Sequence, residues 1–412
     1  MNPGAPPSGD PAPPDGSLPA AAVAEAADQP LSFYVHVPYC RTRCGYCDFN
    51  TYTATELGSG PGASRDTWAQ AAIAELDLAR RVLPETAGVG TVFFGGGTPT
   101  LLPPDDLGSV LDAIDDRFGL LPGAEVTTES NPDSVDAADL TRLRDLGFNR
   151  ISFGMQSASA HVLQLLERTH RAGRPQEAVQ EARAAGFDSV SLDLIYGTPG
   201  ESATDWQQSL DAALAAEPDH VSAYALIVEE GTRLGARVRR GEVPMTDDDD
   251  HADKYLQTEQ ILTTAGFSAY EVSNWARAAG PNEPRVDHRC AHNLAYWRGG
   301  NWWGVGPGAH SHVGGVRWWN VRHPAAWAAR LAAQESPAQA REMLGPDTRR
   351  VERVLLELRL SEGLDLAVLT RLEQERITDL VRRELAMINN GRLVLTLSGR
   401  LLADGIVRDL LD

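Results

Sequence analysis

Residues 39–50, YCRTRCGYCDFN, contain three of the four cysteines in this chain of 412 residues. The three are Cys40, Cys44 and Cys47, spaced as C-x3-C-x2-C. Such a close grouping is improbable by chance in a chain so poor in cysteine, and it is typical of a site built from thiolates. We therefore interpret this loop as a functional site.

The number of sulfurs in the loop indicates which kind of site it is. An iron–sulfur cubane normally takes four thiolates, one for each iron. The loop supplies three, and Asp48, Phe49 and Asn50 just beyond it offer no fourth sulfur. One iron would stay open, and an open metal position can bind a substrate or cosubstrate directly.

Other thiolate chemistries use the same residues. Zinc could be held by the three cysteines, with His36 or the distant Cys290 as fourth ligand. Cys44 and Cys47 could form a dithiol redox pair, which would leave Cys40 without a role. A disulfide framework is disfavoured, because a chain of this length can bury a core of its own.

The cysteine loop follows a short apolar run, and further runs alternate with helical patterns. Candidate strands, rich in β-branched or aromatic residues, span residues 31–37, 91–94, 125–129, 150–153, 189–195 and 220–226. Candidate helices, with apolar residues at every third or fourth position, include residues 67–83, 105–118, 136–146, 175–185 and 204–215. This alternation predicts parallel βαβ units. Six units are too few to close an eight-stranded barrel, so we expect an α/β fold with a partial (β/α)6 barrel over residues 31–245.

Polar and glycine residues gather where these strands end, and chemistry in such barrels sits at the carboxyl ends of the strands. The second strand ends in GGGTPT, residues 95–100, whose glycines let backbone amides approach a ligand. Glu129 ends the third strand, Gln156 follows the fourth, Arg168 is placed on the next helix, and Asp193 lies on the fifth strand. Taken singly, the glycines fit a tight turn, and each polar residue fits a helix cap or a salt bridge at the barrel rim.

The rest of the chain has three further segments. The first 30 residues are rich in Pro, Ala, Gly and Asp and predict a disordered tail. Residues 246–345 form a Trp- and His-rich extension, with seven of the nine tryptophans and five of the ten histidines between positions 275 and 327. Beyond it, helical patterns at 348–360 and 372–387 and a strand-like run at 391–397 predict a small, mostly helical, winged-helix-like domain over residues 346–412.

The overall charge limits the class of partner. Lys and Arg total 37 against 57 for Asp and Glu, a net charge of −20, which disfavours a nucleic-acid backbone or an anionic lipid surface as main partner. No apolar run approaches the roughly 20 residues that span a bilayer, so any membrane contact would be local and peripheral. With few cysteines and no export signal, we expect a cytoplasmic protein.

The cysteine motif and the residues at the strand ends together resemble the radical S-adenosylmethionine (SAM) superfamily, and within it the coproporphyrinogen oxidase-like branch. The resemblance extends from about Tyr34 to the end of the chain. It implies that Cys40, Cys44 and Cys47 bind a [4Fe–4S] cluster whose open iron is chelated by the methionine part of SAM. An electron from the cluster would cleave SAM to methionine and a 5′-deoxyadenosyl radical. The implied SAM contacts are Tyr34, Tyr46, Gly96, Gly97, Thr98, Glu129, Gln156, Arg168 and Asp193.

Two motifs separate the subfamilies of this branch. The oxygen-independent coproporphyrinogen oxidases carry a further cysteine two residues past the third cluster ligand, where this chain has Phe49. The chain instead has an HNxxYW pattern, which resembles the signature of the HemW-type heme chaperones; its members are His292, Asn293, Tyr296 and Trp297. Imidazole ligates heme iron, aromatic rings pack on the macrocycle, and an amide can hold a propionate or orient the histidine.

The resemblance therefore implies heme as a ligand and heme-acceptor proteins as partners. The alternative is that this segment is an aromatic part of the core whose histidines are hydrogen-bonded within the protein, since His and Trp normally have structural roles. His288, Cys290, His310 and His312 are nearby candidate heme ligands. We expect a heme chaperone. The alternative is a radical SAM enzyme of porphyrin biosynthesis that decarboxylates coproporphyrinogen III without oxygen.

Overall fold

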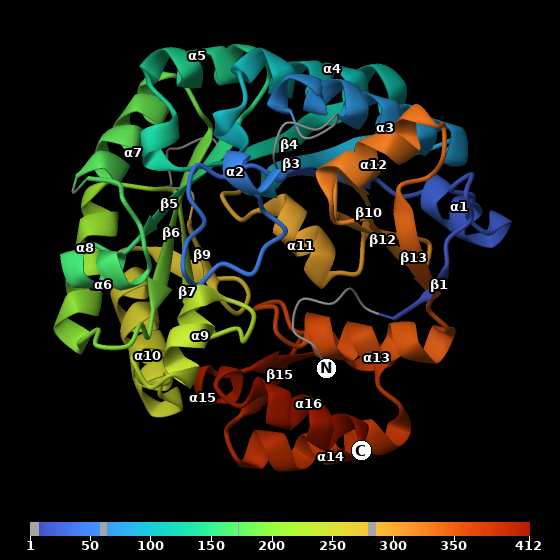
Figure 1. Ribbon diagram of the computed structural model, residues 1–412. Helices are drawn as coiled ribbons and strands as arrows, with labels where there is room; N and C mark the ends of the chain where they lie inside the picture. Colours follow the sequence, from blue (N-terminus) through green and yellow to red (C-terminus); the bar gives the residue numbers. More distant parts are fainter. Residues whose placement is uncertain (1–7, 58–63, 172, 279–285) are drawn as a thin grey trace.

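The computed structural model describes residues 8–57, 64–171, 173–278 and 286–412, and most of its strands join one large curved sheet (Figure 1). The central strands run parallel and neighbour one another in chain order. They are β2 (Leu31–Val37), β3 (Val89–Gly96), β4 (Leu120–Ser130), β5 (Arg150–Gln156), β6 (Ser189–Tyr196) and β7 (His220–Ala225). The six predicted strands are confirmed, and the parallel core is that of a partial barrel.

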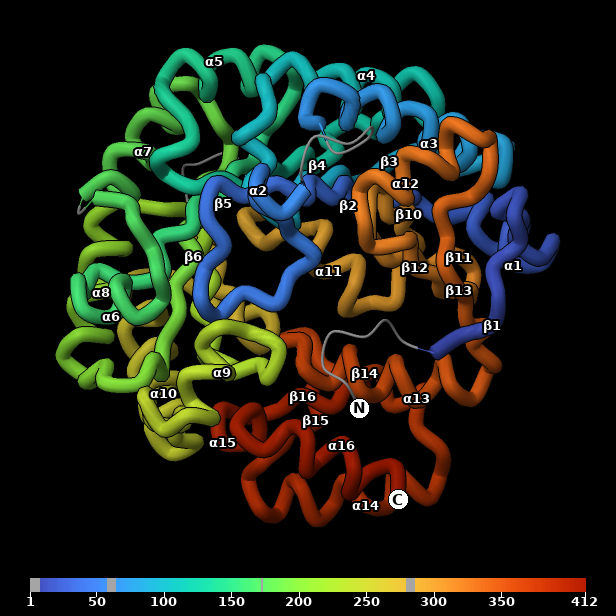
Figure 2. Tube along the Cα trace, viewed as in Figure 1, coloured from blue at the N-terminus to red at the C-terminus, as the bar shows by residue number. Residues whose placement is uncertain are grey.

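Helices cover the outer face of this parallel sheet, as the ribbon and the tube both show (Figures 1 and 2). The outer layer consists of α3 (Trp68–Val82), α4 (Pro104–Phe118), α5 (Ala137–Asp145), α7 (Arg174–Ala184) and α8 (Ala203–Ala215). They agree with the five predicted helices. Shorter or additional helices are α2 (Ala54–Leu57), α6 (Ala160–Leu165), α9 (Arg233–Arg239) and α10 (Asp248–Thr264). Strand residues such as Val35, Phe94 and Leu192 are fully buried, as expected for strands covered on both faces.

Residues beyond α10 lengthen the sheet at both edges. Next to β7 lie β9 (Asn274–Arg277) and β8 (Phe267–Ala269), both antiparallel to their neighbours. On the other side β10 (Asn301–Val305) runs parallel to β2 and leads into β11 (His310–Val313), β12 (Val316–Asn320) and β13 (Ala338–Met343). The helix α12 (Pro324–Ala332) packs against α3. The predicted Trp- and His-rich extension thus builds on the barrel sheet itself.

The HNxxYW pattern lies on a short helix, α11 (Ala291–Trp297), at the centre of the curved sheet (Figures 1 and 2). It packs against β3, where the His292 ring stacks on Phe93 with centroids 5.2 Å apart. The Glu125 carboxylate of β4 accepts the backbone N–H groups of Ala291 and His292. A negative charge on these unpaired amides stabilises the start of the helix.

The predicted disordered tail is wrong for residues 8–30; residues 1–7 lie outside the described residues. Asp10–Pro11 form β1, which pairs with β13, and Ala20–Ala27 form α1. Alanine has the highest helix propensity, and Ala22 and Ala26, four residues apart, are buried on one face. Glu25 on the same helix forms an ion pair with Arg349. The alanines, which contributed to the prediction of a disordered tail, here form a packed helix.

The C-terminal residues form a smaller unit with a core of its own. Its helices are α13 (Pro346–Glu357), α14 (Arg371–Arg382), α15 (Leu397–Arg400) and α16 (Ala403–Leu411). Its sheet has the order β14 (Leu364–Asp365), β16 (Arg392–Leu395), β15 (Ala386–Asn389). The helix predicted over residues 372–387 is too long: it ends at Arg382, and the chain then passes Glu384 at a φ of 57° into β15. Asn390 and Gly391, both with positive φ, make the turn into β16, as an Asn-Gly pair favours.

Lys254 on α10 is the single lysine of the chain, against 36 arginines. Its side chain is 1% exposed and forms ion pairs with Asp250 and Glu201. The ammonium also donates to the Glu201 backbone carbonyl at 3.0 Å. Lys254 therefore fastens α10 to the loop that follows β6, at the carboxyl edge of the sheet.

Candidate functional site

The cysteine loop begins directly after β2 and returns to its own start. Tyr39 and Tyr52 form an isolated bridge, and the Cys40 backbone N–H donates to the Tyr52 carbonyl at 3.0 Å. Arg43 donates to the Thr51 carbonyl and pairs with Glu56 on α2. The loop is thereby closed at its neck and stands at the carboxyl ends of the strands.

All three cysteines in the loop are half-buried. Burial raises the pKa of Cys40, and it raises the pKa of Cys47 to about 11, with the neighbouring sulfurs adding to both shifts. Thiols that are crowded and partly desolvated in this way become thiolates when cationic irons neutralise them. In the described part of the chain no three His, Cys, Asp or Glu side chains converge on a single metal ion. The thiolates of a cubane bind separate corners, so this donor set fits a multi-iron cluster.

Neither of the other two zinc ligands considered is available to the loop. His36 has both ring nitrogens engaged, Nδ1 with the Tyr34 hydroxyl at 3.0 Å and Nε2 with the Asn50 carbonyl at 2.9 Å. Cys290 is buried beside Glu125, with Sγ 3.5 Å from Oε1; Glu125 lies in the middle of β4 and pairs with Thr91, near the start of β3. The cysteine loop lies at the opposite, carboxyl end of the strands.

The GGGT run packs tightly against the cysteine loop. Gly96 has a φ of 105°, and a Cβ there would lie 2.4 Å from the His36 ring; at Gly97 it would lie 2.4 Å from the Tyr39 carbonyl oxygen. The Gly96 N–H donates to Glu129, and those of Gly97 and Thr98 donate to the Val37 and Tyr39 carbonyls. The glycines therefore allow the backbone of this run to lie close to the cysteine loop. Their backbone N–H groups donate to protein groups.

Arg168 joins the cysteine loop to the ends of β4 and β5. Its guanidinium donates to Cys44 Sγ at 3.5 Å, to Asn131 Oδ1 at 2.5 Å and to the Gly154 carbonyl at 2.8 Å. Asn131 donates in turn to the Thr98 hydroxyl at 3.1 Å. The prediction that Arg168 lies on a helix is wrong: α6 ends at Leu165, and Arg168 follows it in a turn. The turn allows the side chain to point back over the strand ends.

Gln156 and Tyr46 lie beside the same guanidinium. Gln156 ends β5 with a φ of 66°, an uncommon conformation for a residue other than glycine. A Cβ on Gly154 would meet both the Gln156 amide and the Arg168 guanidinium within 3 Å. Burial raises the pKa of Tyr46, and the nearby positive charge of Arg168 opposes that shift.

Two carboxylates face the barrel interior, one from β4 and one from β6. Burial raises the pKa of Glu129 to about 7, and the charge of Asp193 raises it further. Burial also raises the pKa of Asp193, although the Ser222 and Ser152 hydroxyls donate to it and oppose the shift. The pair can accept hydrogen bonds from the amino or hydroxyl groups of a ligand.

A cavity of about 490 Å³ opens beside these groups, a volume typical of small-molecule sites. One wall comes from the barrel and the cysteine loop, and the other from α11 and the β10–β12 strands. Its lining residues are Tyr34, His36, Phe49, Asn50, Gly96, Glu129, Tyr296, Trp302, Gly308, His310, Trp319, Asn320 and Arg322. The predicted SAM contacts Tyr34, Gly96 and Glu129 are therefore brought to one cavity.

The HNxxYW residues point in two directions. His292 is 2% exposed, with Nδ1 bonded to the Thr91 hydroxyl at 2.7 Å and Nε2 to the Tyr296 hydroxyl at 2.8 Å. Burial lowers the pKa of His292 to about 3. Asn293 and Trp297 face the other way, toward the Tyr270 side of the helix. Of the four motif residues, Tyr296 is the member that lines the cavity.

The other candidate heme ligands differ in accessibility. Cys290 is buried, and burial raises its pKa to about 12. His312 is also buried, with Nδ1 bonded to the Gly300 carbonyl at 2.9 Å. His288 lies 4.0 Å from Asp219, beside the first residue of β7. His310 differs from these three because it is exposed and lines the cavity.

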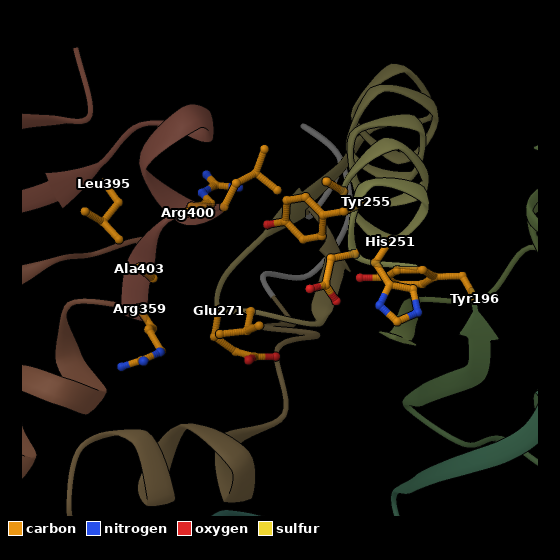
Figure 3. A pocket seen from close by; sticks show the side chains of 12 residues that line it. Tyr196, His251, Tyr255, Glu271, Arg359, Leu395, Arg400 and Ala403 are labelled. Atoms are coloured by element: carbon orange, nitrogen blue, oxygen red, sulfur yellow. The ribbon is translucent and has the colours of Figure 1, made fainter. Parts of the chain in front are cut away.

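A second cavity, of about 230 Å³, lies between α10 and the C-terminal unit (Figure 3). Tyr255 and His251 of α10 face Arg400 and Leu395 across it, and Glu271 lies at its base. Arg400 forms an ion pair with Glu259 of α10 at 3.2 Å. This cavity is part of the contact between the two cores and contains none of the predicted cofactor residues.

Sequence reasoning missed Asn131, Trp302, Trp319 and Arg322 as parts of the site. Asn131 follows Glu129 by two residues, and that position at a strand end is the signal that could have identified it. The tryptophans stood out only as a composition bias. The sequence holds no signal for Arg322, because its place depends on how β12 and α12 pack beside the cysteine loop.

Comparisons with known proteins agree with this geometry. The family model "Radical SAM superfamily" matches residues 34–213. The chain is 51% identical over 383 residues to the heme chaperone HemW of Mycobacterium tuberculosis, covering 93% of this chain and 95% of that protein. It is 38% identical over 288 residues to the heme chaperone HemW of Escherichia coli, covering 69% and 70%. In fold it is similar to the coproporphyrinogen III oxidase HemN of Escherichia coli, with a TM-score of 0.78 at 22% identity, covering 94% and 92%.

Proposed function

Because this chain belongs to the radical SAM superfamily, and within it to the HemW family, we propose that it is a heme chaperone that binds a [4Fe–4S] cluster, SAM and heme. It passes heme to acceptor proteins. The observation that carries the proposal is the 51% identity to a heme chaperone along 93% of the chain. The cysteine loop supports the cluster, and the cavity beside it supports a place for ligands.

Cys40, Cys44 and Cys47 would hold the cluster, and the missing fourth thiolate would leave a position for SAM. When bound, the cluster supplies one-electron chemistry to SAM. Arg168, 3.5 Å from Cys44, places a positive charge beside these thiolates. Glu129 and Asp193 accept hydrogen bonds from SAM, and Tyr34, Tyr46, Gly96, Gly97, Thr98 and Gln156 complete the proposed SAM contacts.

Catalysis on coproporphyrinogen is the rival function. The likeness to coproporphyrinogen III oxidase is one of fold, at 22% identity. Phe49, 58% exposed at the cavity edge, stands where the sequence comparison with the oxidases expects a cysteine. A phenyl ring binds no metal and transfers no proton. The phenylalanine therefore favours a heme chaperone over a decarboxylase.

The test is anaerobic reconstitution with iron and sulfide, followed by two parallel assays. One titrates heme into the protein, and the other supplies coproporphyrinogen III, SAM and a reductant. We expect stoichiometric heme uptake without protoporphyrinogen. Formation of protoporphyrinogen would show that the chain is an enzyme, and failure to bind heme would refute the chaperone proposal.

The remaining expectations from the sequence stay predictions. They are the cytoplasmic location, the absence of nucleic-acid partners, the local nature of any membrane contact and the winged-helix-like character of residues 346–412. Among the residues that the structure describes, no helix is both long and apolar enough to cross a membrane.

A further inference from the structure

The wall of the 490 Å³ cavity that faces the barrel carries aromatic rings and an imidazole. Trp302 stands edge-on to Tyr296, with centroids 4.7 Å apart, and His310 lies nearly parallel to Trp319 at 5.9 Å and 27°. All four rings line the cavity. Phe49 adds a further exposed ring from the cysteine loop. Flat apolar surfaces of this kind fit a large planar ligand.

His310 is the histidine whose ring is placed to bind a metal in that ligand. It is exposed, and within the described residues neither ring nitrogen has a hydrogen-bond partner. Its position is nevertheless fixed, because the Trp302 indole N–H donates to the His310 backbone carbonyl at 2.9 Å and the ring rests against Trp319. A positioned imidazole with an available nitrogen is a standard iron ligand.

His36 and His292, the other histidines near the cavity, are buried and hydrogen-bonded within the protein. Each has both ring nitrogens hydrogen-bonded, His36 to Tyr34 and Asn50, and His292 to Thr91 and Tyr296. Coordination of iron by either histidine would leave a buried hydroxyl or carbonyl without its hydrogen-bond partner, which is unfavourable. His292 would also have to leave its stack on Phe93.

Arg322 supplies a positive charge that could pair with a propionate at the edge of a heme. Its guanidinium lines the same cavity and is held by a 3.2 Å hydrogen bond from Nε to Asn50 Oδ1. The Asn50 amide in turn donates to the Pro307 and Arg322 carbonyls, which ties the cysteine loop to this wall. A guanidinium fixed in this way recognises a carboxylate such as a propionate.

We propose that heme binds in this cavity with His310 as its axial iron ligand, its ring edges against Trp302 and Trp319 and a propionate on Arg322. The HNxxYW helix supports the cavity floor through Tyr296, and His292 positions Tyr296 without touching the iron. The inference rests on the proposed heme-chaperone function and specifies where in the protein the heme is held. The coordinate bond uses the imidazole lone pair and requires no electron or proton transfer.

The test is heme titration of the full-length protein, followed by absorption and electron paramagnetic resonance spectra of the ferric complex. We compare the wild type with His310→Ala, His310→Gly and His292→Ala. His161→Ala is the matched control, because His161 is also exposed but does not line the cavity. We expect His310→Ala to weaken heme binding at least tenfold and to change the spin state, and His161→Ala to match the wild type.

The glycine variant separates a ligand from a merely structural residue. Added imidazole should restore the wild-type spectrum of His310→Gly by occupying the vacated position. In His292→Ala the axial-ligand spectrum should persist in the folded fraction of the protein. A wild-type spectrum in both His310 variants would overturn the inference, as would loss of the axial-ligand spectrum in folded His292→Ala. If the wild type takes up no heme, the proposed function itself fails.

Discussion

Glu75 is a buried carboxylate that connects three parts of the chain. From α3 it accepts the Trp327 indole N–H at 2.7 Å, the Gly306 N–H at 2.8 Å and the Asn320 amide at 2.7 Å. Its neighbours thus come from α12, from the loop after β10 and from β12. This one side chain fastens the barrel to the strands that form the far wall of the cavity.

We expect Glu75→Gln to lower the free energy of unfolding by about 2–3 kcal/mol, because the amide NH₂ would face donors that now meet a carboxylate oxygen. Thermal or denaturant unfolding measures the loss. Glu335→Gln, at an exposed position, is the matched control and should be nearly neutral. Equal effects of the two substitutions would show that Glu75 does not join these segments.

Cys44→Ser should remove the cluster, because each thiolate holds one iron. Iron and acid-labile sulfide, about four of each per chain in the reconstituted wild type, should fall together with the visible absorbance. Cys290→Ser is the control and should keep the cluster, since Cys290 is buried beside Glu125 of β4 and lies outside the cysteine loop. Unchanged iron in Cys44→Ser would contradict the assignment of the loop.

SAM affinity should rise with pH because of Glu129. Burial, with the charge of Asp193 added, raises the Glu129 pKa to about 7, so the carboxyl group is protonated below that pH and ionised above it. SAM carries positive sulfonium and amino groups, which favour the ionised form. Between pH 6 and 8 we expect affinity to increase about tenfold, the factor given by one ionisation with a pKa near 7.

Calorimetric titration of the reconstituted protein across that range measures the effect. Glu129→Gln should bind SAM more weakly at pH 8 and show a flat profile. A steep profile that survives in Glu129→Gln would assign the pH dependence to another group.

Among individual residues, the sequence predicted those whose type and spacing are enough to indicate a chemical role. The three cysteines were singled out by their spacing, Glu129 by its place at the end of a recognisable strand, and Asp193 by its place on one. Which histidine faces the cavity could not be predicted, because both His292 and His310 sit in aromatic segments. Their difference, one enclosed by Thr91 and Tyr296 and the other exposed, depends on contacts between residues about 200 positions apart.

Among the elements, α1 shows that an alanine-rich segment near the N-terminus is structural. Ala26 is 2% exposed, whereas Ala24 on the same helix faces solvent. Ala26→Asp should therefore lower the free energy of unfolding by about 3 kcal/mol through burial of an unpaired charge. Ala24→Asp introduces the same side chain on the solvent face and should have little effect. A disordered tail would make both substitutions neutral, and thermal unfolding distinguishes these cases.

The parallel strands and their helices could be predicted because each has a clear period and a clear boundary. Strands β8 to β13 could not, since they are short, and since β9 and β10 join the barrel through partners, β7 and β2, that lie far away in the chain. The pairing of β10 with β2 joins residues separated by about 270 positions, and no local pattern encodes it. The β15–β16 hairpin had a local signal, the Asn390-Gly391 turn, which the helical period of residues 372–387 obscured.

Among the described residues, the two largest hydrophobic cores are separate, one in the barrel and its added strands and a smaller one in residues 354–410. Leu393 in β16 is fully buried in the small core. Leu393→Ala should cost about 2–5 kcal/mol there, since truncation leaves a cavity. Hydrogen exchange should show lost protection confined to residues 346–412, with the cluster and SAM binding retained. Lost protection across the barrel strands would instead show that the two cores unfold as one unit.

The burial of Lys254 has a practical consequence for experiments on this protein. The ammonium of the single lysine is enclosed by Asp250 and Glu201 and is 1% exposed. We therefore expect amine-reactive dyes and crosslinkers to leave this lysine unmodified in the folded protein. Modification of its ammonium would instead report that α10 has separated from the loop after β6, so lysine reactivity becomes a probe of this one contact.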